Sequence, residues 1–294
     1  MASWSQWVQG ARPRTLPAAL APVAAGTGAA IWQLESVHWP TLLLRAGLAL
    51  LIAVSLQVGV NYANDYSDGI RGTDDERVGP FRLTGSRAAA PAAVKRAAIG
   101  ALALGALAGI VLIILARLWW ALPVGVAAVA AAWFYTGGKR PYGYLGLGEL
   151  FVFVFFGLVA VNGTAYALTG SFTWVALLCS IAIGLLAVAI MLTNNLRDIP
   201  TDRESGKITL AVRLGDRGTR WAFSAAVLLP FALMVPVMVV QWPVLLVLPA
   251  LPLALLPARV VLSGAEGRSL IPVLGAAGRL ELVFSLLLLA GLVL

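Results

Sequence analysis

Nine apolar runs dominate this sequence of 294 residues. Each run is close to the length of about 20 residues that an α-helix needs to cross a hydrocarbon core about 30 Å thick. The runs lie near residues 15–33, 41–62, 96–116, 118–136, 146–168, 173–193, 221–240, 242–262 and 273–293. Because helices satisfy their own backbone hydrogen bonds in lipid, the pattern predicts an all-α, polytopic membrane protein with nine transmembrane helices around a central cavity.

The composition favours the same class of protein. Only 12% of the residues are charged and the mean hydropathy is +0.90, whereas about a quarter of the residues of a soluble domain are charged. No long linker or low-complexity tract separates the runs. We therefore expect residues 1–294 to form a single membrane-embedded domain.

The basic residues predict the orientation of the chain. With the amino terminus in the cytoplasm, 19 of the 21 Lys and Arg residues fall on the cytoplasmic side, and only Arg45 and Arg117 fall on the other. Since cytoplasmic loops carry an excess of Lys and Arg, we expect a cytoplasmic amino terminus, an outer carboxyl terminus and a location in the plasma membrane. This bias, with attraction to anionic headgroups, accounts for the net charge of +8, so the charge indicates no nucleic-acid partner.

Two polar loops, 61–95 and 194–220, hold nine of the 13 acidic residues. Both follow an even-numbered predicted span, which places both on the cytoplasmic side. The first opens with "NYANDYSDGIRGTDD", residues 61–75, in which Asn61, Asn64, Asp65 and Asp68 stand at positions i, i+3, i+4 and i+7. If the preceding helix continues through them, all four project from one face.

The second loop opens with "NNLRDIPTDRESGKITL". Asn194, Asn195, Asp198 and Asp202 stand at positions i, i+1, i+4 and i+8, which again predicts one helical face. Pro200 lies inside this run and lacks a backbone donor, so we expect the helix to kink or end there.

These two clusters indicate a magnesium site. Carboxylate and amide oxygens are hard ligands, and no His or Cys accompanies them, which points away from zinc, copper and iron. Mg²⁺ is typically held by one or two carboxylates together with water and substrate phosphates. Basic residues surround the clusters: Arg71, Arg77, Lys139, Arg140, Arg82, Arg197, Arg203 and Lys207. Acidic side chains that hold Mg²⁺, with basic side chains nearby, predict a site for a diphosphate.

Two other interpretations of the clusters are possible from these residues alone. Charged loops at helix ends are often solvated caps, although two clusters of the same composition on one side argue against coincidence. A transporter would use the acids to bind a transported cation, but it predicts acids near the middle of the membrane at interrupted helices. Here the acids lie at the ends of spans.

The two motifs resemble those of the UbiA superfamily of intramembrane aromatic prenyltransferases. Asn64 and Asp68 match the N-x-x-x-D of that family's first motif, and Asp198 and Asp202 match the D-x-x-x-D of its second. The third acid of the first motif would fall at Gly72, so Asp74 or Asp75 takes its place. The resemblance implies two Mg²⁺ ions held from the set Asn64, Asp65, Asp68, Asp74, Asp75, Asp198 and Asp202.

Within the superfamily, the two motif stretches and "GPFRL" look most like the menaquinone branch. This resemblance implies Mg²⁺-dependent transfer of a polyprenyl group from polyprenyl diphosphate to 1,4-dihydroxy-2-naphthoate, with loss of CO₂ and diphosphate, giving demethylmenaquinone. Acceptors of the 4-hydroxybenzoate or homogentisate type stay open as alternatives. The length of the prenyl chain is not predicted.

The resemblance also implies roles for residues outside the motifs. "YTGGKRPYGY" is similar to a family loop whose basic pair, here Lys139 and Arg140, contacts the diphosphate, and "ARPRTLP" places Arg14 near the aromatic substrate. Tyr135 ends the fourth span, where its ring either supports a carbocation or anchors the interface. The expected catalytic residues are Asp68, Lys139, Asp198 and Asp202. The expected substrate-binding residues are Arg14, Asn61, Arg82, Tyr135, Lys139, Arg140, Asn195, Arg197 and Lys207.

Glu149 is a further candidate because it is an ionisable group at the membrane edge. A salt bridge to an arginine is the alternative role for it.

Overall fold

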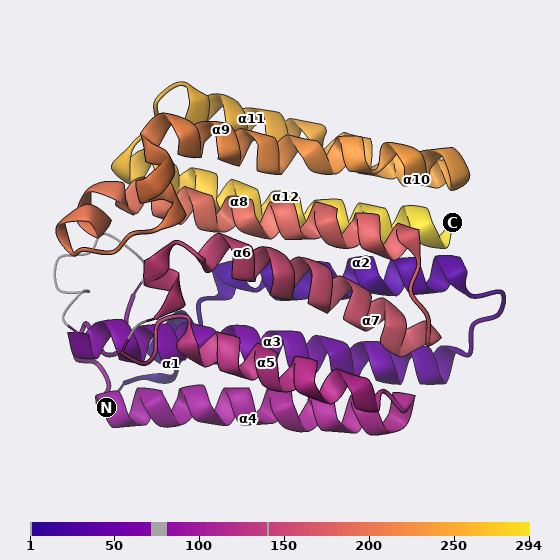
Figure 1. The fold of residues 1–294 in the computed structure, drawn as a ribbon, viewed down its shortest axis with the longest axis horizontal. Helices are drawn as coiled ribbons and strands as arrows, with labels where there is room; N and C mark the ends of the chain where they lie inside the picture. The colour runs from indigo at the N-terminus through magenta and orange to yellow at the C-terminus, as the bar shows by residue number, and fades with distance from the viewer. Residues whose placement is uncertain (1, 72–80, 140) are drawn as a thin grey trace.

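Long helices lying alongside one another make up almost all of the structure, a computed structural model that describes residues 2–71, 81–139 and 141–294 (Figure 1). These residues contain no β-strand. Three of the predicted site residues, Asp74, Asp75 and Arg140, lie outside the described residues, as does Arg77.

The first half of the chain contains five α-helices and three short 3₁₀ segments among the described residues. In chain order they are α1 (Trp4–Gly10), η1 (Pro13–Thr15), α2 (Pro17–Gln33), α3 (Trp39–Arg71), α4 (Pro91–Ala116), η2 (Trp119–Ala121), α5 (Leu122–Phe134) and η3 (Tyr142–Leu145).

The second half continues with α6 (Gly148–Val152), the π-helical segment η4 (Phe153–Val159), α7 (Ala160–Thr169) and α8 (Trp174–Glu204). It ends with α9 (Leu210–Leu233), α10 (Val235–Val240), η5 (Trp242–Ala250), α11 (Leu251–Leu262), η6 (Gly267–Ser269) and α12 (Leu270–Val293).

Seven helical stretches of the described chain are long and apolar enough to cross a membrane. They are Trp39–Arg71, Pro91–Ala116, Gly148–Thr169, Trp174–Glu204, Leu210–Val240, Trp242–Leu262 and Gly267–Val293. An eighth is reached if Trp4–Thr15 and Pro17–Gln33, which meet at a bend of 50°, count as one span. The stretch Trp119–Phe134 is apolar but shorter. Several membrane-spanning helices are thus present, as the sequence predicts.

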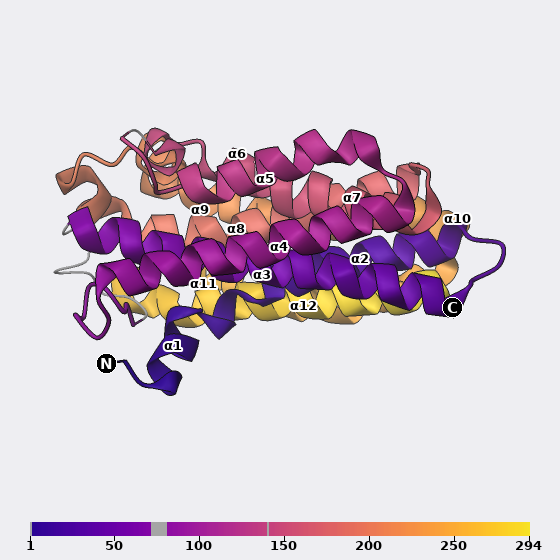
Figure 2. The same cartoon turned by 90° about the horizontal axis from the view of Figure 1, so that it is seen from below.

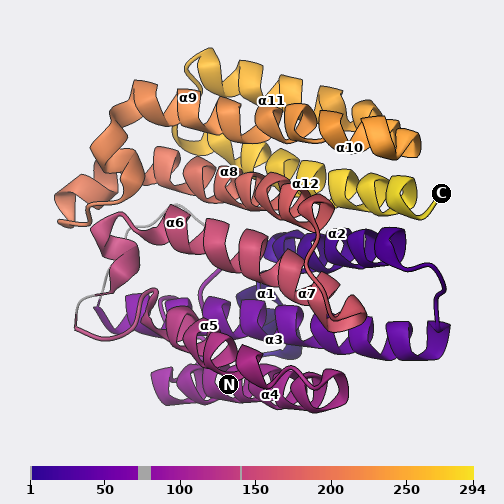
Figure 3. The ribbon, with the colours of Figure 1, turned by 45° about the vertical axis from the view of Figure 1, so that its right-hand side comes forward.

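The helices pack in an order that differs from their order in the chain. α4 packs on α3, α2 packs on α7 and α12, and α8 packs on α9 and α12. Figures 2 and 3 show the same bundle from below and from an oblique angle, and in Figure 2 the short helix α1 projects from the side of the bundle. The amino and carboxyl termini lie at opposite ends of the bundle (Figures 1 and 2).

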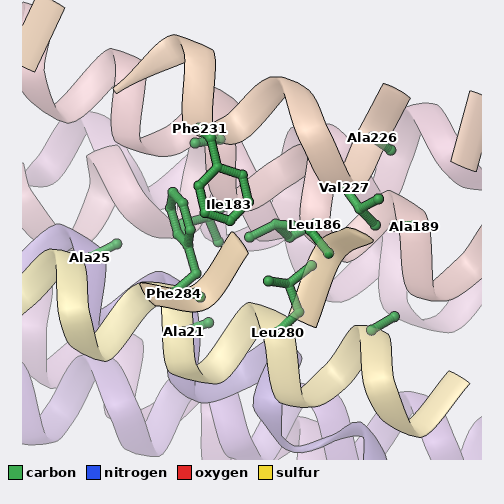
Figure 4. Close-up of a cluster of buried hydrophobic side chains, with 14 of the residues drawn as sticks. Ala21, Ala25, Ile183, Leu186, Ala189, Ala226, Val227, Phe231, Leu280 and Phe284 are labelled. Atoms are coloured by element: carbon green, nitrogen blue, oxygen red, sulfur yellow. The ribbon is translucent and has the colours of Figure 1, made fainter. Parts of the chain in front are cut away.

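The main core lies where α8, α9 and α12 meet (Figure 4). Phe231 and Phe284 pack edge to face there with ring centroids 5.2 Å apart, an arrangement that aromatic rings favour. α8 is the central helix: 67% of its apolar window is buried inside the protein, against 22% for α3. α3 therefore presents most of its apolar surface outwards, as a helix in contact with lipid does.

Both motif-bearing helices extend beyond their predicted spans. α3 runs to Arg71 and carries the first motif on its last turns. α8 runs through Pro200 to Glu204, so the helix does not end at Pro200. Two carbonyls of this last stretch accept hydrogen bonds. Thr201 Oγ1 donates to Asp198 O and Ser205 N donates to Thr201 O, both at 3.0 Å.

Candidate active site

A cavity of about 1240 Å³ lies inside the bundle, bordered by α2, α3, α4, α5, the α6–α7 span and α8. Most of its wall is apolar, with small residues such as Gly105 and Gly109 on α4 and aromatic residues such as Phe155 on η4. Polar groups gather at one end, where the two motifs lie. A cavity of this kind fits a ligand with a polar head and a long apolar tail.

Many of the predicted site residues border this one cavity. They are Arg14, Asn61, Asn64, Asp68, Arg82, Tyr135, Asn195, Arg197 and Lys207. The described lining does not include Asp65, Lys139, Asp198 or Asp202. Asp68 and Asn194 are 126 residues apart in sequence, yet the two motifs meet at the same end of the bundle, where only some of their side chains border the cavity.

Asp68 is the acid of the first motif that faces the cavity. It is buried, and its Oδ1 accepts a hydrogen bond from the Tyr144 hydroxyl at 2.9 Å. Its Oδ2 lies 3.3 Å from Arg82 Nη2. The carboxylate is thus held by one neutral donor and one cation, which fixes its direction towards the polar end of the cavity.

Tyr144 connects the two motifs. Its ring lies 5.2 Å from Lys207 Nζ and 5.5 Å from the guanidinium carbon of Arg71, measured to the ring centroid. Burial, followed by the charge of Asp68 and the hydrogen bond to it, raises the pKa of Tyr144 to about 12. Tyr144 therefore keeps its proton at neutral pH and remains a donor to Asp68.

The loop that carries Tyr144 is bonded to the loop that follows α8. Ile208 N donates to Tyr144 O at 3.1 Å, and Arg213 Nη2 donates to Leu145 O at 2.7 Å. The backbone of residues 142–145 is thereby fixed relative to Lys207.

Asp65, predicted to hold a metal ion, is engaged by the backbone of another segment. It is fully buried, and its two oxygens accept backbone hydrogen bonds from Leu83 N at 2.6 Å and Thr84 N at 2.8 Å. A carboxylate engaged in this way holds the turn that carries Arg82. The expected common face holds for Asn61, Asn64 and Asp68, which border the cavity, whereas Asp65 turns away from it.

Asn64 is bonded to a residue that the sequence analysis did not single out. Thr136 Oγ1 donates to Asn64 Oδ1 at 2.8 Å, which leaves a second lone pair on that oxygen. The guanidinium of Arg71 donates to the carbonyls of Thr136 and Gly138. The end of α3 is therefore attached to the loop that leads to Lys139, which is itself exposed.

The acids of the second motif are each paired with a cation. Asp198 accepts two hydrogen bonds from Arg197, at 2.7 and 2.9 Å, and Asp202 Oδ1 lies 3.4 Å from Lys207 Nζ. Within the described chain no three His, Cys, Asp or Glu side chains come close enough to hold a metal ion by themselves. The donor set consists of scattered oxygens, which suits Mg²⁺, since Mg²⁺ takes part of its coordination from water and substrate phosphates.

The amino-terminal segment forms another part of the polar end. Asn61 Nδ2 donates to Ala11 O at 2.8 Å and to Thr15 Oγ1 at 2.9 Å, and Gln57 Nε2 donates to the same Thr15 oxygen at 3.0 Å. Asn61, predicted to bind substrate, thus holds the segment on which Arg14 lies. Arg14 borders the cavity from η1.

Aromatic rings follow one wall of the cavity. The rings of Tyr135 and Tyr142 lie 5.6 Å apart, and Tyr142 stacks on Phe151 with centroids 4.1 Å apart. The sequence interpretation assigns roles to Tyr135 and the basic pair of "YTGGKRPYGY" but none to Tyr142 or Tyr144. The spacing of the three tyrosines in that segment was the available signal.

Comparison with known protein families identifies the family of this chain. Residues 19–292 match the family described as the UbiA prenyltransferase family. The chain belongs to the UbiA prenyltransferase family. As a member of this family it is a transferase of prenyl groups, and the transporter alternative is set aside.

Two relatives match over nearly the whole chain. The 1,4-dihydroxy-2-naphthoate octaprenyltransferase of Mycobacterium tuberculosis (strain ATCC 25618 / H37Rv) is 56% identical over 290 residues, covering 97% of this chain and 96% of that protein. The protein of the same name from Mycobacterium leprae (strain TN) is 50% identical over 286 residues, covering 97% and 95%.

A solved UbiA structure shares the fold. The UbiA homologue from Archaeoglobus fulgidus bound to DMAPP and Mg²⁺ superimposes with a TM-score of 0.59 over 98% of this chain and 99% of that chain, at 16% sequence identity. The similarity extends over the full helical bundle.

Proposed function

We propose that this protein transfers a polyprenyl group from polyprenyl diphosphate to 1,4-dihydroxy-2-naphthoate, releasing CO₂ and diphosphate and giving the prenylated 1,4-dihydroxynaphthalene, the reduced form of demethylmenaquinone. The observation that carries the proposal is the cavity, whose polar end joins both Asn- and Asp-containing motifs and whose remaining wall is apolar. The identity of 56% to an enzyme named for this acceptor supports the choice of naphthoate.

Asn64 and Asp68 on α3, with Asp198 and Asp202 on α8, would hold two Mg²⁺ ions, and Asp74 or Asp75 would add a ligand. The homologue solved with DMAPP and Mg²⁺ supports the use of this metal. When bound, Mg²⁺ neutralises the diphosphate and makes it a better leaving group. The cation partners of Asp68, Asp198 and Asp202 lie within 3.4 Å of them and are placed to share the phosphate oxygens.

The first step is cleavage of the allylic C–O bond, whose electron pair leaves with the diphosphate. Arg82 and Lys207 border the cavity at the polar end and stabilise the developing negative charge. We propose the same role for Lys139 and Arg140. The allylic carbocation is kept from water by the apolar wall, and the stacked rings of Tyr142 and Phe151 offer π faces to it.

The second step is attack of the electron-rich naphthalene ring on the allylic carbon. A new C–C bond forms at the ring carbon that carries the carboxylate, and the C–CO₂⁻ bond breaks to return its electron pair to the ring. Arg14 is our choice for orienting the carboxylate, since a guanidinium grips a carboxylate through two hydrogen bonds.

We propose that the chain crosses the membrane nine times, through the seven long stretches together with α2 and the η2–α5 segment. It places the amino terminus and the polar end of the cavity at the cytoplasmic side of the plasma membrane. The distribution of Lys and Arg supports this orientation. Termini at opposite ends of the bundle are those expected for an odd number of crossings.

The test uses the purified protein in detergent or lipid with Mg²⁺ and radiolabelled farnesyl diphosphate. The acceptors are 1,4-dihydroxy-2-naphthoate, 4-hydroxybenzoate and homogentisate in parallel reactions. Of the three acceptors, we expect only the naphthoate to give a prenylated product, and we expect no product after chelation of the metal. A product formed only with another acceptor would overturn the choice of substrate, and full activity in excess chelator would overturn the role of the metal.

A further inference from the structure

Glu149 is a buried carboxylate at the first turn of α6, behind the wall of the cavity. It is 4% exposed, and its Oε1 accepts a hydrogen bond from Asn195 Nδ2 at 2.7 Å. This bond joins α6 to α8, and the alternative contact, a salt bridge to an arginine, is not formed among the described residues. Glu149 lies close enough to Lys207 and Asp202 to interact with their charges.

The bond to Glu149 determines which end of the Asn195 amide faces the cavity. The side chain has an NH₂ donor on one side and a carbonyl acceptor on the other. A carboxylate oxygen accepts hydrogen bonds, so it selects the NH₂ group and turns the carbonyl oxygen the other way. Asn195 borders the cavity, and its Oδ1 accepts no hydrogen bond from any described residue.

A carbonyl oxygen facing the cavity excludes one kind of ligand atom and favours another. It repels phosphate oxygens, so Asn195 is not a donor to the diphosphate. It requires an O–H donor or a cation. Asn195 lies three residues before Asp198 on α8, about 4.5 Å further from the helix end, and it borders the cavity where Asp198 and Asp202 do not. Asn195 thus lies further along α8 from the helix end than the two acids and has access to the cavity.

We propose that Glu149 is a positioning residue that holds the amide of Asn195 so that its carbonyl oxygen accepts a hydrogen bond from a ring hydroxyl of the aromatic acceptor. This inference rests on the proposed function, because the dihydroxynaphthoate has two hydroxyl donors and the prenyl chain has none. It assigns Asn195 to the acceptor rather than to the diphosphate.

The test is a double-mutant cycle on Glu149→Gln and Asn195→Asp, with Mg²⁺, farnesyl diphosphate and the naphthoate. The introduced glutamine can donate or accept, so it no longer fixes the amide of Asn195. The introduced aspartate has no N–H to offer Glu149. In the double variant, the glutamine donates to one oxygen of the aspartate, and the other oxygen still faces the cavity as an acceptor.

We expect each single variant to raise KM for the naphthoate about tenfold, the effect of losing one well-placed hydrogen bond, and to change KM for farnesyl diphosphate little. The double variant should recover a large part of this loss. The matched control is Asn194→Asp with Glu149→Gln, because Asn194 donates to Ile190 O instead of Glu149. No recovery is expected in that pair.

Two outcomes overturn the inference. In the first, Asn195 donates to a phosphate oxygen, and the double variant turns a carboxylate towards the diphosphate. The double variant is then the least active of the four proteins in the cycle, and its defect is in KM for farnesyl diphosphate. Purely additive losses would also contradict the proposed orientation. Thermal unfolding and gel filtration of each variant separate these results from a failure to fold.

A second measurement serves if Asn195→Asp does not fold. Methyl ethers of the acceptor hydroxyls should cost the parent enzyme about tenfold in kcat/KM and cost Asn195→Ala little. An equal penalty in both would contradict the inference. Absence of any product from the parent enzyme with the naphthoate would be a failure of the proposed function, and the cycle would then be run with the acceptor that the panel identifies.

Discussion

The Tyr144 hydroxyl donates a hydrogen bond to Asp68 Oδ1 at 2.9 Å, and the same ring lies against Lys207 Nζ. One neutral side chain thus contacts the acid of the first motif and the cation that pairs with the second. Asp68 has its direction set before any ligand arrives, because it is held on both oxygens.

Tyr144→Phe should lower kcat/KM for the prenyl diphosphate about tenfold or more, since a hydrogen bond to a charged group contributes about 1.5–3 kcal/mol. The ring remains, so the protein should fold normally. The matched control is Tyr142→Phe, whose lost bond is to the Ala131 carbonyl at 2.8 Å rather than to a carboxylate. Steady-state kinetics with both substrates varied would check this. Equal effects of the two substitutions would remove the special role of Tyr144.

Tyr144 should ionise at a higher pH than a tyrosine of the unfolded chain. Its pKa is raised to about 12 by burial and by Asp68, whereas an unfolded tyrosine ionises near pH 10. The Tyr144 hydroxyl therefore contributes folding stability that is fully present below about pH 10 and is lost as the pH rises towards 12. The ultraviolet difference titration of the parent against Tyr144→Phe should show the missing phenolate only at the alkaline end. A difference that develops below pH 10 would contradict the assignment.

Asp65→Asn and Asp68→Asn should differ in their effects on stability and activity. Asp65→Asn places an NH₂ group against backbone donors that now bond its carboxylate, so it should destabilise the fold by about 1–3 kcal/mol. Asp68→Asn should leave the melting temperature close to that of the parent and remove most turnover. Thermal unfolding and activity measured on the same preparations decide the question. A stable but inactive Asp65→Asn variant would return Asp65 to the metal ligands.

Arg14→Lys should raise KM for the naphthoate and leave KM for the prenyl diphosphate little changed. Lysine keeps the charge but loses the forked donor that binds a carboxylate through two hydrogen bonds. Kinetics with each substrate varied in turn, alongside Arg14→Ala, measure the effect. If both variants behave like the parent, Arg14 contributes only to orientation in the membrane.

Gly125→Leu should shorten the prenyl chain that the enzyme accepts. Gly125 borders the cavity on α5, and a Cβ there would meet no atom within 4 Å. The added side chain would therefore occupy space left for the ligand. Gly100→Leu on α4 is the matched control, because its Cβ is equally unobstructed but Gly100 does not border the cavity. Product analysis with farnesyl diphosphate and a longer donor should show loss of the longer product in Gly125→Leu alone.

Much of this arrangement could be predicted from the sequence. The apolar runs coincide with helices, and the motif spacing places Asn61, Asn64 and Asp68 on one face of α3. Asp65 could not be assigned in the same way, because its direction depends on two backbone donors 18 and 19 residues further on. Tyr144 was missed for a similar reason, since its partner Asp68 lies 76 residues away. Periodicity describes a helix face but not the loop that packs against it.

The bonds from Ile208 to the Tyr144 carbonyl and from Arg213 to the Leu145 carbonyl have a consequence for local unfolding. The amide of Ile208 has its acceptor on residues 142–145 and not in its own segment, so its protection from solvent depends on them. In amide hydrogen exchange, Ile208 should therefore be released only when residues 142–145 open, and the two loops should exchange as one cooperative unit.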